Sequence, residues 1–335
     1  MATRPLLPGC CSPVDDIRWF APNAYSWLIV PELRRRGLKV AVEGTAPARL
    51  VFAAGARVAD VAWRFSRATR SRLILYIWDL PPRATGSGRP DPVWWLAGHF
   101  LRLPRPFGGY GRRRGYFSRL NYIAARADAV WVASTLTREL MAERFGVAAE
   151  RVPYCYDSER FRPAGAAPSR PPTLLCVSRL QPHKNQAAVL RAASTFRREV
   201  RVRLIGRGPE SQTLANAAAA LGVHCDIETD ASDATVTEAY HSAGVVVCPS
   251  RFEGFGLTPI EGVASGAPVV ASDISPHREF VGTAAKFFEL EDDDALVGAI
   301  NAALDGGPAD PELVRGLTIP AAGERFLSSL GPYLR

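Results

Sequence analysis

Residues 243–273 read AGVVVCPSRFEGFGLTPIEGVASGAPVVASD, a pattern of two short apolar runs on either side of a longer mixed segment. The runs AGVVVCPS and APVVASD are typical of buried parallel strands, and the segment between them has room for one helix. Glu253 falls in a glycine-bearing turn after the first strand, and Glu261 falls within the helix. Because open α/β sheets bind ligands at the carboxyl edge of their strands, the stretch predicts an α/β fold with a ligand site around these glutamates.

The glycines around Phe255 indicate what the ligand contains. Gly254 and Gly256 carry no side chain, so backbone N–H groups can approach an anion such as a phosphate at the start of the helix. Two carboxylates would repel a phosphate, but they accept hydrogen bonds from the neutral hydroxyls of a ribose or a sugar ring. The pattern therefore predicts a ligand with both phosphates and hydroxyls. The alternative is that Glu253 caps the helix and Glu261 is a solvated helix residue.

The segments EGFGLTPIE and SGAPVVASD together resemble the donor-binding signature of retaining GT-B glycosyltransferases, the large bacterial group similar to glycosyltransferase family four. A second match is LLCVSRLQPHKN, which carries Arg179 and Lys184, and a Gly-Pro turn follows in LIGRGPE. The resemblance covers most of residues 125–285. It implies a hexosyltransferase that moves a sugar from a nucleotide diphosphate sugar to a hydroxyl acceptor, with retention of anomeric configuration and without a metal or another cofactor.

The resemblance also assigns roles to individual residues. Arg179 and Lys184 would hold the diphosphate of the donor, Glu253 would hold the hydroxyls of the transferred sugar, and these three residues would form the catalytic set. Glu261 would hold the ribose. The other expected donor-binding residues are Gly206, Gly254, Phe255, Gly256, Leu257 and Thr258. Positive charge beside a departing diphosphate is electrostatic catalysis, which usually contributes most to an enzyme's rate.

The chain length predicts two domains. Its 335 residues exceed the usual size of one domain, and a hydrophobic content of 47% is enough for two cores. The resemblance implies the GT-B arrangement, in which two Rossmann-like doubly wound domains face a central cleft. We expect an acceptor-binding domain over residues 1–164 and a donor-binding domain over 165–335, divided at the linker AGAAPSRPP, with a last helix that returns to the first domain.

Composition indicates a cytoplasmic protein. No run of about 18 apolar residues predicts a transmembrane helix, and the start MATRPLLPGCC lacks the apolar core and cleavage site of a signal peptide. Six cysteines are scattered without C-x-x-C spacing. Expected partners are the nucleotide sugar and its acceptor, a small molecule or a lipid-linked glycan; we expect no nucleic acid and no obligate protein partner.

The first half of the chain differs in charge from the second. Residues 1–160 hold 25 Lys and Arg against 13 Asp and Glu, and they contain all seven tryptophans. This half also contains an insertion at residues 81–119, which includes VWWLAGHFLRL and the run Arg112–Arg114. Two hypotheses stay open. The insertion either docks on an anionic membrane, at the inner face, or forms a lid over a soluble acceptor.

Two residues of this half are acceptor-side candidates. The strand in RLILYIWDLPP ends at Trp78 and Asp79, where many relatives carry His-Asp facing the acceptor, so a tryptophan replaces the histidine. Asp79 either orients an acceptor hydroxyl or forms a turn before Leu-Pro-Pro. His99 is the second candidate, although no carboxylate stands near it in sequence and a packed histidine explains it as well.

Other functions and sites are less well supported by the sequence. The chain has no G-x-G-x-x-G that opens a first βαβ unit and no G-x-x-x-x-G-K-[ST], which disfavours dehydrogenases and P-loop enzymes. A nucleotide-sugar-binding protein without turnover stays open. Alternating acids in HCDIETDAS, which we expect to form a loop near the base, and the cluster Asp292–Asp294 are expected to be structural, the latter at a helix start.

Overall fold

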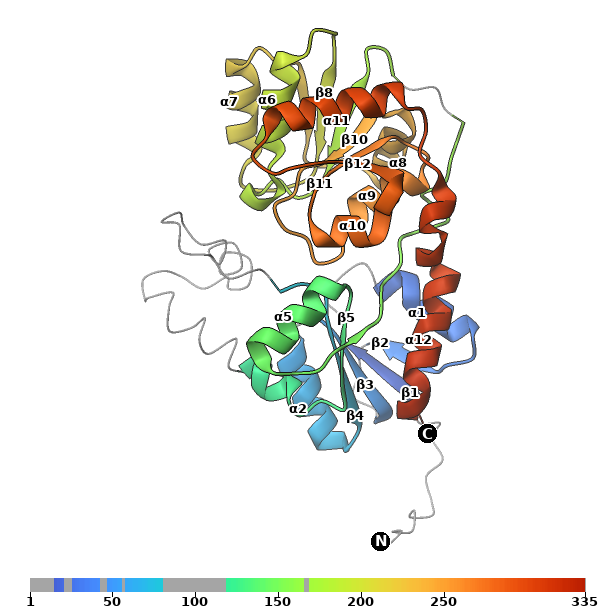
Figure 1. Cartoon of the computed structure of the whole chain (residues 1–335). Coiled ribbons are helices and arrows are strands. Elements are labelled where there is room, and N and C mark those ends of the chain that lie inside the picture. Colours follow the sequence, from blue (N-terminus) through green and yellow to red (C-terminus); the bar gives the residue numbers. More distant parts are fainter. Residues whose placement is uncertain are drawn as a thin grey trace, which may run out of the picture.

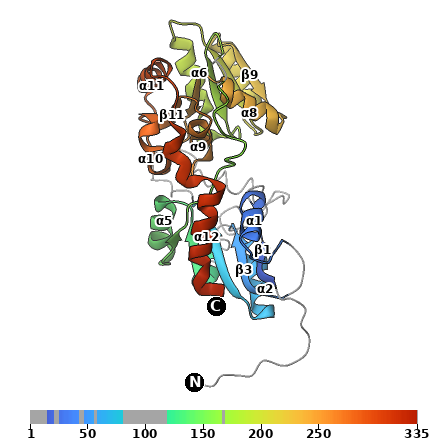
Figure 2. The ribbon, with the colours of Figure 1, turned by 90° about the vertical axis from the view of Figure 1, so that its right-hand side faces the viewer.

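The structure is a computed structural model that describes residues 15–20, 26–42, 47–55, 58–80, 119–165 and 169–334 (Figure 1). Two lobes lie one above the other, and each is built around a parallel sheet that helices cover (Figures 1 and 2). The predicted α/β class with two doubly wound units is therefore confirmed. The proposed boundary between residues 164 and 165 falls between the last strand of one sheet and the first strand of the other.

Among the described residues, the first sheet has six parallel strands in the order β2-β1-β3-β4-β5-β6. Its middle strands are continuous apolar runs such as RLILYI, as expected for strands buried on both faces. The strands are β1 Asp15–Phe20, β2 Val40–Val42, β3 Ala48–Ala54, β4 Arg72–Ile77, β5 Ala129–Val132 and β6 Glu150–Arg151. The helices are α1 Ser26–Arg35, α2 Ala59–Thr69 and α5 Thr135–Phe145.

The second sheet has the order β12-β11-β10-β7-β8-β9, again all parallel, in the described part of the chain. The strands are β7 Thr173–Val177, β8 Arg201–Ile205, β9 Cys225–Glu228, β10 Val245–Cys248, β11 Val269–Ser272 and β12 Ala285–Phe288. The helices are α6 Gln186–Thr195, α7 Ser211–Ala220, α8 Asp233–Ser242, α9 Leu257–Ala264, α10 Ser275–Val281 and α11 Asp293–Asp305, with 3-10 turns η1 Pro182–Lys184, η2 Gly282–Ala284 and η3 Pro311–Leu317.

One local prediction is wrong. The segment HCDIETDAS was expected to be a loop, but residues Cys225–Glu228 form β9 and pair with β8. This strand lies at the edge of the sheet, where polar residues alternate with half-buried ones, and such alternation in a short run resembles a polar loop in sequence.

The last helix, α12 Ile319–Leu334, packs against the first sheet although it follows the second in the chain (Figure 2). Its Phe326 is fully buried, and the ring centroid lies 6.0 Å from that of Phe52 and 5.6 Å from that of Trp131. Trp19 stacks on Phe52 with a centroid distance of 4.1 Å. The first core therefore needs both ends of the described chain, which ties the two lobes together.

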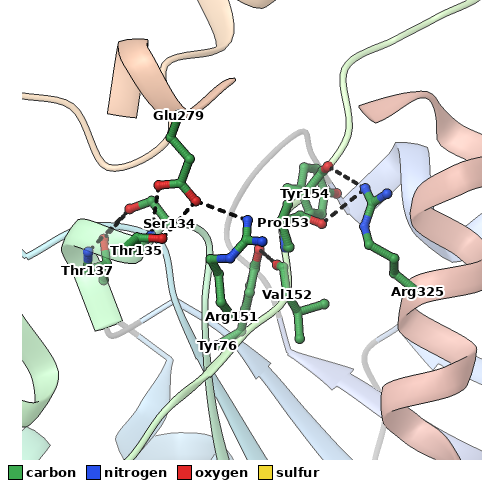
Figure 3. Close-up of polar contacts among 10 residues, drawn as sticks. All are labelled: Tyr76, Ser134, Thr135, Thr137, Arg151, Val152, Pro153, Tyr154, Glu279 and Arg325. Atoms are coloured by element: carbon green, nitrogen blue, oxygen red, sulfur yellow. Dashed lines mark hydrogen bonds and ion pairs between the residues drawn. The ribbon is translucent and has the colours of Figure 1, made fainter. Parts of the chain in front are cut away.

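A polar contact also joins the lobes directly, between α10 and α5 (Figure 3). Glu279 accepts hydrogen bonds from the backbone N–H of Thr135 over 2.9 Å and from its hydroxyl over 3.1 Å. Arg151 Nη1 lies 3.0 Å from the same carboxylate. A carboxylate at the N-terminus of a helix is favourable, because the helix dipole and the unpaired N–H groups of the first turn both attract it.

Candidate functional site

The two segments predicted to bind a donor meet at one edge of the second sheet. Strands β7 and β10 are neighbours, with Val245 opposite Leu174 and Val246 opposite Leu175. The chain leaves β7 toward Arg179 and leaves β10 toward the glycine-bearing turn. The strand order reverses between these two strands, and such a switch point opens a crevice at the carboxyl edge of a parallel sheet.

Glu253 accepts two short hydrogen bonds in this crevice. Lys184 Nζ lies 2.5 Å from Glu253 Oε1, and the hydroxyl of Ser250 donates to the same oxygen over 2.7 Å. Burial raises the pKa of Glu253, but the charge of Lys184 and the two hydrogen bonds outweigh it and lower the pKa to about 2. The carboxylate is therefore ionised at neutral pH, and it can accept further hydrogen bonds from neutral hydroxyls.

Glu261 lies on α9 in a different electrostatic environment. Burial raises its pKa to about 7, although the hydroxyl of Tyr240 donates to Glu261 Oε2 over 2.9 Å and the nearby Arg160 also favours the ionised form. Tyr240 itself is fully buried and packs edge-on against Phe161 at a centroid distance of 5.2 Å. The two glutamates thus have pKa values shifted in opposite directions, which is a common property of binding and catalytic sites.

Two predicted glycines allow close approaches of the backbone, and a third allows a left-handed turn. A Cβ at Gly206, whose φ is +146°, would overlap the carbonyl oxygen of Ser178 just after β7. A Cβ at Gly254 would overlap the carbonyl oxygen of Trp78 in the other lobe. Gly256 has a φ of +84° and precedes the first residue of α9, a left-handed conformation that favours glycine.

The other predicted donor residues fix the start of α9. Thr258 donates its hydroxyl proton to the carbonyl oxygen of Val177, at the end of β7, over 2.8 Å. Phe255 is buried, and its ring centroid lies 4.3 Å from that of Phe280 on α10. Leu257 packs against the same core. These contacts hold the N-terminus of α9 beside the end of β7, so its backbone N–H groups face the crevice edge.

Gln186 is a site residue that the sequence analysis missed. This side chain is 1% exposed, and its amide nitrogen donates to the hydroxyl of Ser178 over 2.9 Å and to the carbonyl oxygen of Arg179 over 3.0 Å. It follows Asn185, whose φ of +56° turns the chain from η1 into α6. The sequence contained a signal for this role, because a glutamine directly after Lys184 and Asn185 begins a helix at the carboxyl edge of the sheet.

The structure brings one acceptor-side candidate to the donor turn. Asp79 follows β4, and a Cβ on Gly254 would lie 2.9 Å from the Asp79 Cα. The ring of Trp78 packs against Tyr76 and Tyr154, with centroid distances of 4.7 Å and 4.5 Å. Asp79 therefore lies where the two lobes meet. The second candidate, His99, lies outside the described residues, as does nearly all of the insertion at 81–119.

The acidic clusters have structural roles. Glu228 pairs with Arg203 at 2.6 Å, and Asp230 pairs with Arg207. Asp292 caps α11 by accepting from the backbone N–H of Ala295 over 2.8 Å. Within the described ranges, no group of three or more His, Cys, Asp or Glu side chains is arranged to hold a metal ion. No helix in that part of the chain is both long and apolar enough to cross a bilayer.

Comparison with known sequences finds a family match in the second half of the chain. Residues 157–315 match the family described as Glycosyl transferases group 1. The GDP-mannose-dependent alpha-(1-6)-phosphatidylinositol monomannoside mannosyltransferase of Mycolicibacterium smegmatis is 32% identical over 62% of this chain and 59% of its own length. The phosphatidyl-myo-inositol mannosyltransferase of the same organism is 30% identical over 50% of this chain and 46% of its own. The chain thus spans about half the length of these relatives.

Comparison with solved structures covers nearly the whole chain. Anabaena Alr3699/HepE, solved in complex with UDP and glucose, has a TM-score of 0.71 and 14% identity over 94% of this chain and 99% of its own. A sucrose-phosphate synthase from Thermosynechococcus elongatus has a TM-score of 0.61 and 18% identity over 86% and 71% of the two chains. At this level of identity the likeness concerns the fold.

Proposed function

Because the chain has the GT-B fold and residues 157–315 belong to glycosyl transferases group 1, we propose that the protein moves a sugar from a nucleotide diphosphate sugar to a hydroxyl acceptor. One observation carries the proposal. At the switch point of the second sheet, the turn with Arg179 and Lys184 and the turn with Glu253 lie side by side, and Lys184 keeps Glu253 ionised. A site with cations and an ionised acceptor fits a ligand with both phosphates and hydroxyls.

The chemistry follows from where charge develops. As the bond between the sugar and the diphosphate breaks, negative charge grows on the departing phosphate, and Arg179 and Lys184 offset it. The acceptor oxygen bonds to the anomeric carbon from the same face, and its proton passes to the departing phosphate, so configuration is retained. We propose this route without a metal, since positive side chains and the N–H groups at the start of α9 are available for the diphosphate.

GDP-mannose is the first donor to test. Both Mycolicibacterium smegmatis relatives are named as mannosyltransferases, and the name of the first specifies GDP-mannose dependence. Their names also specify phosphatidylinositol acceptors, and the first half of this chain is basic, with 25 Lys and Arg against 13 Asp and Glu in residues 1–160. We therefore propose an anionic, hydroxyl-bearing acceptor, lipid-linked or soluble, that contacts the first lobe near Asp79.

Two measurements on the full chain test this function. GDP, UDP and ADP, each alone and as its sugar, are screened for a rise in melting temperature, because ligands that bind the native state stabilise it. Release of the diphosphate from the best donor is then followed with inositol-bearing acceptors. Turnover supports a transferase, whereas stabilisation without any turnover supports the alternative of a binding protein. Turnover that persists in excess EDTA supports the metal-independent route, and its loss contradicts that route.

The acceptor source is tested with vesicles. The protein is proposed to be cytoplasmic, with contact to the inner membrane face if the acceptor is a lipid. Co-sedimentation with vesicles that contain anionic phosphatidylinositol should then weaken with salt and in the double variant Trp94→Ala/Trp95→Ala, two positions outside the described residues. If the protein does not bind the vesicles at low salt, the soluble acceptor is supported instead.

A further inference from the structure

A chain of hydrogen bonds links Glu253 to residues at the ends of two neighbouring strands and on α10. Ser250, which donates to Glu253, receives at its own carbonyl oxygen a hydrogen bond from the hydroxyl of Ser272 over 2.5 Å. The carbonyl oxygen of Ser272 lies 3.0 Å from His277 Nδ1. These residues come from the ends of β10 and β11 and from α10, so three elements join beneath the donor turn.

The contacts of His277 define its tautomer. A carbonyl oxygen can only accept, so the Nδ1 atom that faces the Ser272 carbonyl carries the proton. The Ser272 hydroxyl lies 3.3 Å from the same nitrogen. Because this hydroxyl donates its hydrogen bond to the Ser250 carbonyl oxygen, it is an acceptor toward His277. Burial lowers the pKa of His277, although Glu253 opposes this, so the ring is neutral at pH 7. The other nitrogen, Nε2, is then a hydrogen-bond acceptor.

This acceptor has no visible donor. His277 is 1% exposed, and across the described ranges no group donates a hydrogen bond to its Nε2. The ring edge faces the donor turn, because a Cβ on Gly256 would lie 3.5 Å from Nε2 and 3.1 Å from Cδ2. Buried polar atoms are nearly always paired, so an unpaired acceptor beside a ligand turn points to a group that the bound ligand supplies.

The tautomer limits what that group is. A diphosphate carries no proton to donate at neutral pH, whereas the hydroxyls of a sugar do. We propose that His277 Nε2 accepts a hydrogen bond from a hydroxyl of the transferred sugar, and that His277 is thus a sugar-recognition residue beside Glu253. This inference rests on the proposed function, because it requires a nucleotide sugar in the crevice.

The test compares a nucleotide with its sugar. His277→Asn keeps an amide donor near the position of Nδ1, facing Ser272, but places nothing at the position of Nε2. Binding of GDP should stay within about twofold of wild type, while GDP-mannose should bind about tenfold more weakly, the size expected for one lost hydrogen bond. His277→Gln is the matched variant, because its amide oxygen reaches the position of Nε2 and should restore part of that affinity. UDP and UDP-glucose replace this pair if the wild type prefers them.

Each outcome is decisive. Equal losses for GDP and GDP-mannose would mean that His277 only holds the turn, and unchanged affinity for both would mean that a water occupies Nε2; either result overturns the inference while leaving the transferase intact. If His277→Asn does not fold, the same comparison is made with His277→Gln, whose partial loss of affinity should be larger for GDP-mannose than for GDP, and equal losses would overturn the inference. A wild type that binds no nucleotide sugar would overturn the proposed function and this inference with it.

Discussion

Replacing Glu261 by Gln should stabilise the free protein at neutral pH. Burial raises the pKa of Glu261 from its ordinary 4.5 to about 7, despite the hydrogen bond from Tyr240. Between these two values the folded protein binds more protons than the unfolded chain, so stability falls as pH rises. A difference of about 2.5 pKa units corresponds to roughly 3 kcal/mol, lost in full above about pH 7. Gln keeps the shape of Glu and has no charge to bury.

Urea unfolding at several pH values between 5 and 8 measures this effect. The free energy of unfolding of the wild type should fall across the range, whereas Glu261→Gln should lose about 2.5 kcal/mol less, because the window begins slightly above the unfolded pKa. Tyr240→Phe is the matched control. It removes a donor that favours the ionised carboxylate, so the pKa of Glu261 should rise further and the fall in stability should extend to a higher pH than in the wild type. Parallel curves for wild type and Glu261→Gln would refute the assignment of a raised pKa to this residue.

The same residue should have the opposite effect on the donor. If Glu261 holds the ribose, its ionised form is the better acceptor, and donor affinity should fall as pH drops below about 7. Glu261→Ala should mainly raise the donor KM, because ribose contacts are similar in the ground state and the transition state. If Glu261→Gln is more stable than the wild type but binds the donor more weakly, the buried charge of Glu261 is kept for ligand binding. A stabilised Glu261→Gln with an unchanged donor KM would contradict the ribose role of Glu261.

Three further changes test the other contacts. Arg179→Ala or Lys184→Ala should lower kcat about a hundredfold or more while the protein still folds, as expected for a lost electrostatic donor; near-wild-type turnover would remove that residue from the mechanism. Glu253→Ala should lower kcat more than it raises the donor KM in steady-state kinetics. An effect on KM alone would mean that the roles assigned to Glu253 and Glu261 are reversed. Glu279→Ala removes the carboxylate that caps Thr135 across the lobes and should cost roughly 1 kcal/mol in urea unfolding, whereas an unchanged midpoint would contradict a stabilising contact.

Much of the fold could be predicted because its signals are local. The helix that begins at Ser26 ends before Gly37, whose φ is +96°, and α5 begins after Ser134, which accepts from Thr137, as the capping pattern indicates. The first strand could not be predicted in this way. DDIRWF follows Pro13 closely, begins with two acids and contains the buried Arg18, so its sequence resembles a polar loop. Tertiary packing of Ile17 and Trp19 against β3 and α12 makes it a strand.

The relative positions of the candidate residues were predictable where these residues stand close in sequence. Glu253 and Glu261 lie on one turn and its helix, and the motif also located the segment of Lys184. The contacts that support this turn depend on sheet order. Ser272 and His277 come from the next strand and helix, and only the neighbouring positions of β10 and β11 bring them beneath Ser250.

The most direct test of the central claim is the release of nucleoside diphosphate from a panel of nucleotide sugars, including GDP-mannose and UDP-glucose, with and without an inositol-bearing acceptor. We predict that the full chain turns over at least one donor in the presence of an acceptor, and that Lys184→Ala lowers this rate about a hundredfold. A wild type whose melting temperature rises with a nucleotide sugar but that releases no diphosphate with any donor and acceptor would contradict the assignment as a glycosyltransferase.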